Sequence, residues 1–120
     1  MVVDDNVDAA DMLADILRIE GHTVRVEYSS TAALARTSTL PVDLYILDIG
    51  LPDLDGYELV RRLRAVPSNA HSVFVALTGY SQAHDKVLSR SAGFDHHMIK
   101  PVDLLHLDAV IRSIKRGQST

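Results

Sequence analysis

The chain has 120 residues, 47% of them hydrophobic and 23% charged, so it can bury enough apolar surface for one domain and too little for a second. A formal net charge of −4 without long runs of one sign argues against general attraction to nucleic acid or to an anionic membrane, and the lack of cysteine excludes disulfides and thiolate catalysis. There is no apolar run of roughly 20 residues and no signal-peptide pattern, so we expect one soluble, cytoplasmic domain over residues 1–120.

The first third of the chain predicts strands and helices in alternation. In order, they are a strand over 1–3, a helix over 8–20, a half-covered edge strand over 22–28 and a short helix over 31–38. The first strand is so short that the amino terminus looks trimmed. Asp8 is the expected N-cap of the first helix, and Ser29 or Ser30 that of the second. The apolar positions of the first helix are Met12, Leu13, Ile16, Leu17 and Ile19.

The stretch 42–48 is apolar on both of its alternating sides, which is typical of a strand covered on both faces of a parallel sheet. It ends at Asp48, a carboxylate that would be costly to bury without partners. Gly50 and Pro52 follow and form a turn. This strand is therefore expected at the centre of the sheet, with an acid at its carboxyl end.

The rest of the chain continues the alternation. The expected elements are a helix from Gly56 to Pro67, a strand over 72–77, a helix over 81–92, a strand over 97–99, a helix capped by Asp103, and a frayed tail over 117–120. Arg61, Arg62 and Arg64 are expected on a solvated helix face. The last helix is expected to face inward with Leu104, Leu105, Leu107, Val110, Ile111 and Ile114.

Strands that alternate with helices form right-handed crossovers and hence a parallel sheet. The sequence therefore predicts an α/β, flavodoxin-like, doubly wound (βα)5 fold with strand order 2-1-3-4-5, in which the strand over 22–28 lies at one edge. All parallel strands deliver their carboxyl ends to the same side of the sheet, where open α/β sheets bind ligands.

Five polar residues follow four of these strands: Asp4, Asp5, Asp48, Thr78 and Lys100. Three neighbouring carboxylates repel one another unless a cation lies among them. Their few protein oxygens suit Mg2+, which keeps several waters and accepts phosphate oxygens. An ammonium and a hydroxyl can meet a phosphoryl group, so the set is fit to form an aspartyl phosphate, with Asp48 as the nucleophile.

These residues resemble the receiver domain of two-component response regulators over essentially the whole chain. The segments that carry the resemblance are 2–6, 47–56, 77–79 and 93–101, in that order. The sequence around residues 95–103 especially resembles that of receivers attached to hybrid sensor kinases. The resemblance implies a signalling switch that promotes its own phosphorylation and dephosphorylation, rather than a turnover enzyme.

The resemblance also implies a role for each residue. Asp48 would accept a phosphoryl group from a histidine kinase or a histidine phosphotransfer protein. Asp5, Asp48 and the carbonyl group of Gly50 would bind Mg2+, with Asp4 helping through water. Thr78 and Lys100 would contact the phosphoryl group, with a cis bond between Lys100 and Pro101. Gly50 and Tyr80 occupy positions that tune the access of water. His97 stands where the family often has Tyr or Phe, so an aromatic switch is in doubt here.

Simpler interpretations stand beside these. Asp4 and Asp5 alone would fit a helix-capping loop, and Asp53 and Asp55 are expected to shape a loop rather than to bind metal. His96 and His97 are expected to point to opposite faces of a strand and to share no ion.

The competing functions are an aspartyl-phosphate phosphohydrolase, although Gly50 stands where such enzymes carry a second acid, and a docking module independent of phosphorylation. The sequence names no kinase, signal, output domain or oligomeric state, and no nucleic-acid or membrane contact is expected of this domain.

Overall fold

The computed structural model describes residues 1–37, 42–79 and 90–118, with side chains described to residue 114. Five parallel strands form one sheet in the order β2-β1-β3-β4-β5. The strands are β1 (Val2–Val3), β2 (Val26–Glu27), β3 (Leu44–Asp48), β4 (Val73–Thr78) and β5 (His96–Ile99). The helices are α1 (Val7–Ile19), α2 (Ser30–Thr37), α3 (Gly56–Arg64) and α5 (Leu104–Gln118), with a 3-10 turn at Pro67–Asn69. The predicted doubly wound fold and strand order are confirmed.

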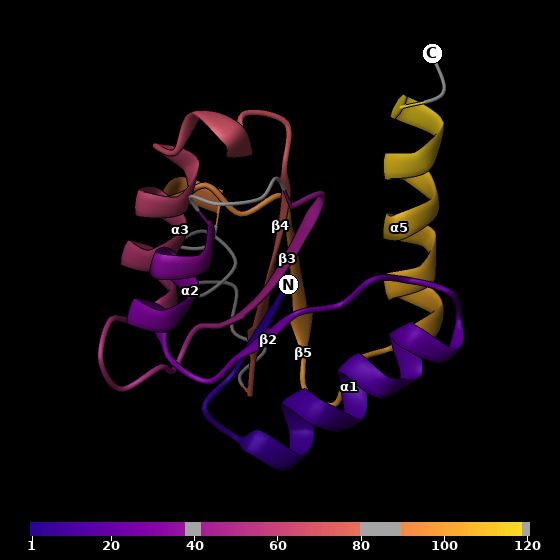
Figure 1. Ribbon diagram of the computed structural model, residues 1–120, viewed down its shortest axis with the longest axis horizontal. Helices are drawn as coiled ribbons and strands as arrows, with labels where there is room; N and C mark the ends of the chain where they lie inside the picture. Colours follow the sequence, from indigo (N-terminus) through magenta and orange to yellow (C-terminus); the bar gives the residue numbers. More distant parts are fainter. Residues whose placement is uncertain (38–41, 80–89, 119–120) are drawn as a thin grey trace.

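Two apolar layers enclose the sheet, with α2 and α3 on one face and α1 and α5 on the other (Figure 1). The alternation along β3 explains this, because Tyr45 and Leu47 pack on the α2 and α3 side whereas Ile46 packs on the α1 and α5 side. All three side chains are at most 2% exposed. The central strand therefore has little freedom, and it fixes the position of Asp48 at its end.

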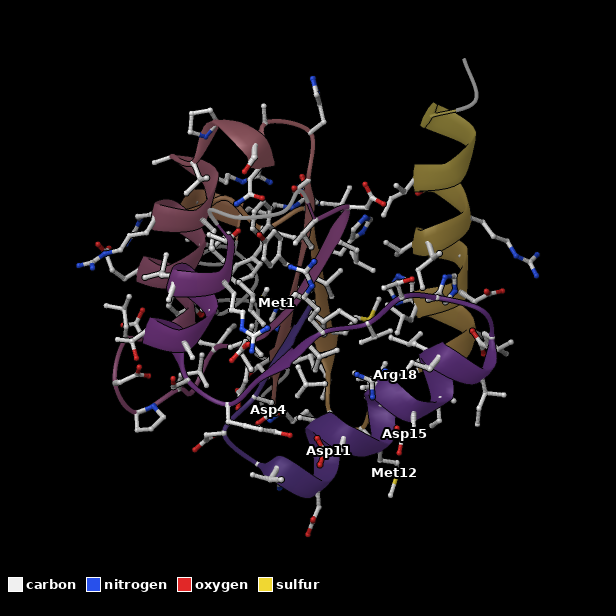
Figure 2. The ribbon with its side chains drawn as sticks, viewed as in Figure 1. Met1, Asp4, Asp11, Met12, Asp15 and Arg18 are labelled. Carbon is white, nitrogen blue, oxygen red and sulfur yellow. The ribbon has the colours of Figure 1, made fainter. Side chains whose placement is uncertain are left out.

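The beginning of α1 and the second strand differ from the prediction. Asn6, not Asp8, is the N-cap, because the Asn6 side chain accepts a hydrogen bond from the Ala9 N–H at 3.1 Å. Met12 and Ile19 do not face inward, being 65% and 85% exposed, and Figure 2 shows Met12 on the side of α1 away from the sheet. Strand β2 is shorter than expected because, among the described residues, it pairs only with the two residues of β1.

The end of the chain was predicted in part. Asp103 caps α5 as expected, accepting hydrogen bonds from the N–H groups of Leu105 and His106. Leu104 and Leu105 are nevertheless 42% and 84% exposed, so the inward placement predicted for them was wrong. The helix runs to Gln118 although a frayed tail was predicted from residue 117. Of the helix predicted over 81–92, only 90–92 lie in the described part, and these residues are helical.

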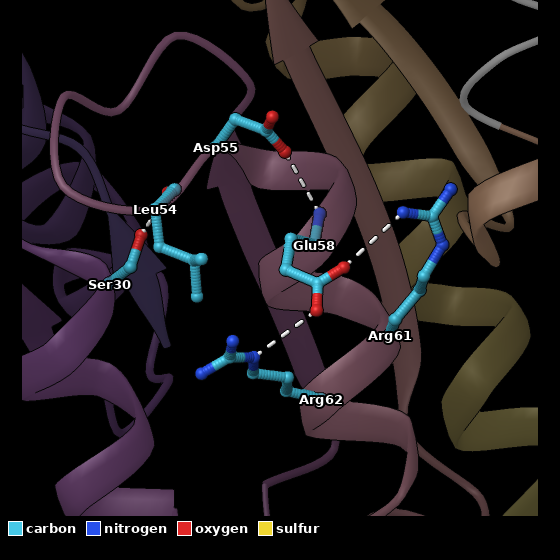
Figure 3. A network of polar contacts seen from close by, with 6 residues as sticks. All are labelled: Ser30, Leu54, Asp55, Glu58, Arg61 and Arg62. Atoms are coloured by element: carbon cyan, nitrogen blue, oxygen red, sulfur yellow. Dashed lines mark hydrogen bonds and ion pairs between the residues drawn. The ribbon is translucent and has the colours of Figure 1, made fainter.

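The three arginines of α3 do not share one solvated face. Arg61 and Arg62 lie in solvent and pair with Glu58 of the same helix, as Figure 3 shows. Arg64 instead reaches across to the loop before β5. Its Nε donates to the Gly93 carbonyl oxygen at 2.5 Å, and its Nη2 lies 2.8 Å from Asp95. The prediction of a solvated Arg64 was therefore wrong.

Among the described residues, no helix combines the length and the apolar character needed to cross a membrane.

Candidate functional site

Four strands bring the predicted site residues to one edge of the sheet. Asp4 directly follows β1, Asp48 is the last residue of β3, Thr78 is the last residue of β4, and Lys100 directly follows β5. Strands β1 and β3 are neighbours, and Asp48 pairs in register with Leu77, the residue before Thr78. Figure 2 shows Asp4 at the end of β1, near the beginning of α1. Residues far apart in sequence therefore meet here.

Lys100 joins the two buried acids of the site. Its Nζ lies 3.2 Å from Asp4 Oδ2 and 3.1 Å from Asp48 Oδ2. Asp4 and Asp48 are 3% and 8% exposed, and their other oxygens accept backbone hydrogen bonds. The Asn6 N–H donates to Asp4 Oδ1 at 3.0 Å, and the Gly50 N–H donates to Asp48 Oδ1 at 2.9 Å. Both carboxylates are thus held in fixed orientations.

The pKa values at the site reflect its crowding. Burial raises the pKa of Asp4, and the neighbouring Asp48 raises it further. The Asn6 N–H and Lys100 act in the opposite direction, but the net pKa of Asp4 still lies above 3.8. Burial lowers the pKa of Lys100, but the adjacent Asp48 and Asp4 outweigh this effect and place its pKa above 10.5. Lys100 is therefore cationic at neutral pH, and it offsets only part of the repulsion between the acids.

The acidic cluster fits a magnesium ion. Asp4, Asp5 and Asp48 can each offer one carboxylate oxygen, and these oxygens lie within 4.8 Å of one another. All three ligands are hard oxygen donors, and the exposed Asp5 leaves one side of the cluster open to water or to phosphate oxygens. Burial, and after it the neighbouring Asp48, raises the pKa of Asp4, and a cation bound among the three acids would favour its ionised form. These observations support the choice of Mg2+ over an ion that needs a full protein cage.

The loop between β3 and α3, residues 49–55, is held close to the sheet at both of its ends. The Ile49 N–H donates to the Leu77 carbonyl oxygen, and the Gly56 N–H donates to the Ile49 carbonyl oxygen, both at 3.0 Å. Gly56 must be a glycine, because a Cβ atom there would lie 2.6 Å from the Cα of Ile49 and 2.9 Å from the carbonyl oxygen of Asp48. The first turn of α3 thus packs tightly against the backbone of Asp48 and Ile49.

The Lys100 side is fixed by the neighbouring strand. The Lys100 N–H donates to the Thr78 carbonyl oxygen at 2.8 Å, and the peptide bond between Lys100 and Pro101 is cis, as predicted. Thr78 is 6% exposed at the end of β4.

Comparison with known proteins decides the family. The profile of the response regulator receiver domain matches residues 1–112. The chain belongs to this family. Receiver domains are generally signalling switches that interact with histidine kinases. This receiver domain is 33% identical over 118 residues to the response regulator ArlR of Staphylococcus epidermidis, a match that covers 98% of the chain but 52% of the relative. The chain therefore spans about half the length of that protein.

Solved structures agree with this assignment. A two-component response regulator from Clostridium difficile superposes with a TM-score of 0.90 at 25% identity, covering 99% of this chain and 96% of that one. A receiver domain protein from Methanospirillum hungatei superposes with a TM-score of 0.86 at 27% identity, covering 98% and 94%.

Two predicted positions are not tested by this arrangement. Tyr80 lies outside the described residues. His97 lies on β5, in register with Ala76, and the preceding His96 faces α5, where its ring centroid is 6.5 Å from that of His106. Because neighbouring residues of a strand alternate, His97 lies on the other side of the sheet from His96.

Sequence reasoning missed three residues that shape the receiver site. Asn6 holds Asp4 through its N–H, and the close approach of Gly56 was not foreseen. Asp53 was expected to shape its own loop, but its carboxylate also reaches the start of α2. A polar residue directly after Asp4 and Asp5 was a usable signal for Asn6, whereas nothing in the sequence pairs Asp53 with a helix some twenty residues earlier.

Proposed function

We propose that this receiver domain takes a phosphoryl group from a phosphohistidine onto Asp48 and that the modification changes its interactions with partner proteins. The observation that carries the proposal is the position of Lys100, whose ammonium group lies within 3.2 Å of both buried acids, in a cluster whose third acid is open to solvent. Such a site offers a nucleophile and positive charge beside it, which phosphoryl transfer needs.

The transfer follows from these groups. A carboxylate oxygen of Asp48 attacks the phosphorus atom of the donor, and the bond from phosphorus to the imidazole nitrogen breaks. The electron pair of that bond stays on the nitrogen, so a protonated phosphohistidine leaves as neutral imidazole and Asp48 need not lose or gain a proton. The buried β3 strand holds Asp48 at the edge, and the Gly50 N–H fixes one of its oxygens at 2.9 Å, which limits the orientations to be searched.

The remaining residues bind and neutralise the transferred group. Asp5, Asp48 and the Gly50 carbonyl group would hold Mg2+, with Asp4 acting through water. Bound Mg2+ supplies positive charge to the phosphoryl oxygens. Lys100 would exchange its contact with Asp48 for a contact with a phosphoryl oxygen, and Thr78 would donate its hydroxyl hydrogen to another.

The natural partners under this proposal are a histidine kinase or a histidine phosphotransfer protein, with the receiver working as a switch rather than as a turnover enzyme. Strand β5, with His97, is the described element through which a changed Lys100 contact would reach the surface, because Lys100 directly follows it. The helix predicted over 81–92 would respond as well under this proposal, but most of it lies outside the described residues.

Acetyl phosphate and MgCl2 provide a direct test. Intact-mass spectrometry should detect one added phosphate on the wild-type protein and none on Asp48→Asn, and EDTA should abolish the addition. A wild type that gains no more phosphate than Asp48→Asn would refute the proposal. Repeated hydrolysis of a phosphomonoester by the wild type would instead favour the phosphohydrolase.

A further inference from the structure

The loop that follows the phosphoacceptor strand is tied to helix α2 by contacts that the proposed chemistry does not use. The Asp53 carboxylate accepts hydrogen bonds from the Ser30 N–H at 3.3 Å, from the Thr31 N–H at 3.1 Å and from the Thr31 hydroxyl at 3.2 Å. In the reverse direction, the Ser30 hydroxyl donates to the Leu54 carbonyl oxygen at 2.5 Å, a contact seen in Figure 3. We call these four hydrogen bonds the α2 tether.

The α2 tether is more than a capping contact within one segment. Helix α2 already has a local cap, since the Ala32 N–H donates to the Ser29 hydroxyl oxygen at 3.2 Å. Asp53 adds acceptors for two N–H groups of the first turn from a loop over twenty residues away in sequence. The N–H of Thr31, followed by that of Ser30, lowers the pKa of Asp53 to about 2 against the opposing effect of desolvation, so the carboxylate is ionised at neutral pH.

The tether acts on the segment that carries the expected backbone ligand of Mg2+. Loop 49–55 has no regular secondary structure, and Gly50 is exposed within it. On one side the loop is fixed by hydrogen bonds at Ile49 and Gly56. Between these two points Asp53 and the Leu54 carbonyl group hydrogen-bond to α2, while the side chains of Leu51 and Leu54 pack against the core. A loop pinned on both sides presents its carbonyl groups in a narrow range of orientations.

We propose that Asp53 is a positioning residue that raises the affinity of the site for Mg2+ by pinning loop 49–55 to α2. The inference rests on the proposed function, because it takes the Gly50 carbonyl group as a magnesium ligand. Asp53 itself does not touch the metal. Removing a residue that orients a metal ligand without touching the metal typically lowers the metal affinity by 10–100-fold. Because water can still occupy most of the magnesium shell, we expect the lower end of this range.

The test is a titration of isotopically labelled protein with MgCl2, followed through amide chemical shifts, together with urea unfolding. Asp53→Ala should weaken Mg2+ binding by about tenfold. Asp53→Asn loses the charge but keeps an oxygen acceptor, and it should regain a large part of the affinity. Asp55→Ala is the matched control, because Asp55 lies in the same loop, carries the same charge and caps α3 through the Glu58 N–H at 2.9 Å. It should lower the urea midpoint but leave the Mg2+ affinity within about twofold of the wild type.

Several outcomes would overturn the inference. Unchanged Mg2+ affinity in Asp53→Ala would remove the positioning role, and equal weakening by Asp55→Ala or by Asp53→Asn would assign the effect to charge or to general loop damage. If Asp53→Ala does not fold, Thr31→Ala decides, since it removes one hydrogen bond of the tether and should weaken binding measurably. The acetyl phosphate assay is run in parallel. Failure of the wild type to gain phosphate would refute the proposed function, whereas normal phosphorylation with unchanged Mg2+ affinity of the variants would refute this inference alone.

Discussion

Replacement of Arg64 by alanine should destabilise the receiver domain far more than replacement of its neighbours on α3. The Arg64 side chain is 33% exposed, and its guanidinium group makes three different contacts. It donates to the Gly93 carbonyl oxygen at 2.5 Å, pairs with Asp95 at 2.8 Å and lies 4.6 Å from the centroid of the Phe74 ring. The same Asp95 carboxylate accepts the Phe74 N–H at 2.8 Å, so Arg64 links α3 to β4 and to the start of β5.

The expected loss follows from these contacts. A hydrogen bond from a charged donor contributes about 1.5–3 kcal/mol, a half-exposed ion pair about 0.5 kcal/mol, and a cation–π contact about 0.5–1 kcal/mol. We therefore expect Arg64→Ala to lower the free energy of unfolding by about 3 kcal/mol. Arg64→Lys keeps the positive charge, but lysine lacks the planar guanidinium group that contacts the carbonyl and the carboxylate at the same time. It should therefore lower the free energy of unfolding by about half as much.

Urea unfolding at neutral pH measures this effect, with Arg61→Ala and Arg62→Ala as controls. Both control side chains are 56% exposed, and among the described residues each forms an ion pair with Glu58 alone, so each replacement should cost no more than about 0.5 kcal/mol. An Arg64→Ala variant that unfolds within about 0.5 kcal/mol of Arg62→Ala would show that the link across β4 and β5 contributes little.

Three further variants probe the site and its supports. Asp4→Asn should stabilise the metal-free protein, measured in EDTA at pH 7. The pKa of Asp4 is raised in the folded state, so its ionised form is disfavoured there and lowers the free energy of unfolding as the pH rises above 3.8. The same variant should reduce the stabilisation that Mg2+ provides. Gly56→Ala should cost about 2–3 kcal/mol and slow phosphorylation, because its Cβ would lie 2.9 Å from the carbonyl oxygen of Asp48. Gly93→Ala should cost more than Gly21→Ala, because both have positive φ but only Gly93 would also place a Cβ 2.9 Å from a guanidinium nitrogen.

Each of these has a contradicting result. If metal-free Asp4→Asn is less stable than the wild type at pH 7, the neighbours of Asp4 compensate the negative charge of its carboxylate. Normal phosphorylation of Gly56→Ala would show that a displaced Asp48 backbone does not impair the reaction. Equal costs at Gly93 and Gly21 in urea unfolding would show that the neighbouring guanidinium group moves aside freely.

The convergence of the candidate site residues was predictable because it depends on where strands end, and strand ends are marked by abrupt changes from apolar to polar residues. Asp4, Asp48 and Lys100 each stand at such a change, and parallel topology then brings them together without further information. The fold was predictable for a related reason, since β3 and β4 are apolar on both faces and can only lie inside a covered sheet.

The buried faces of the helices were harder to predict, because the type of each residue was given more weight than its position in the helical period. In α1 the buried stripe includes the small residues Ala10 and Ala14, which a search for large apolar side chains overlooks, and this stripe leaves Met12 outside. Arg64 lies four residues after the buried Val60, so it is on the buried side of α3 despite its charge. Position in the helical period was a usable signal in both cases.

Contacts between segments distant in sequence leave no periodic signal at all. Neither the α2 tether at Asp53 nor the contact of Arg64 with Asp95 can be read from a local pattern, because each joins two loops or helix ends whose approach depends on the whole fold. Exposed Leu105 belongs to the same class, since whether a helix start is covered depends on how far the sheet extends beneath it.

The contact of one ammonium group with two acids has a consequence for the selection of ions. Three carboxylates against the single charge of Lys100 leave the cluster with two uncompensated negative charges when all are ionised. A monovalent cation can offset only one of these charges, whereas one divalent cation offsets both. Electroneutrality therefore favours a doubly charged ion before geometry is considered, and potassium in excess should compete poorly with millimolar magnesium.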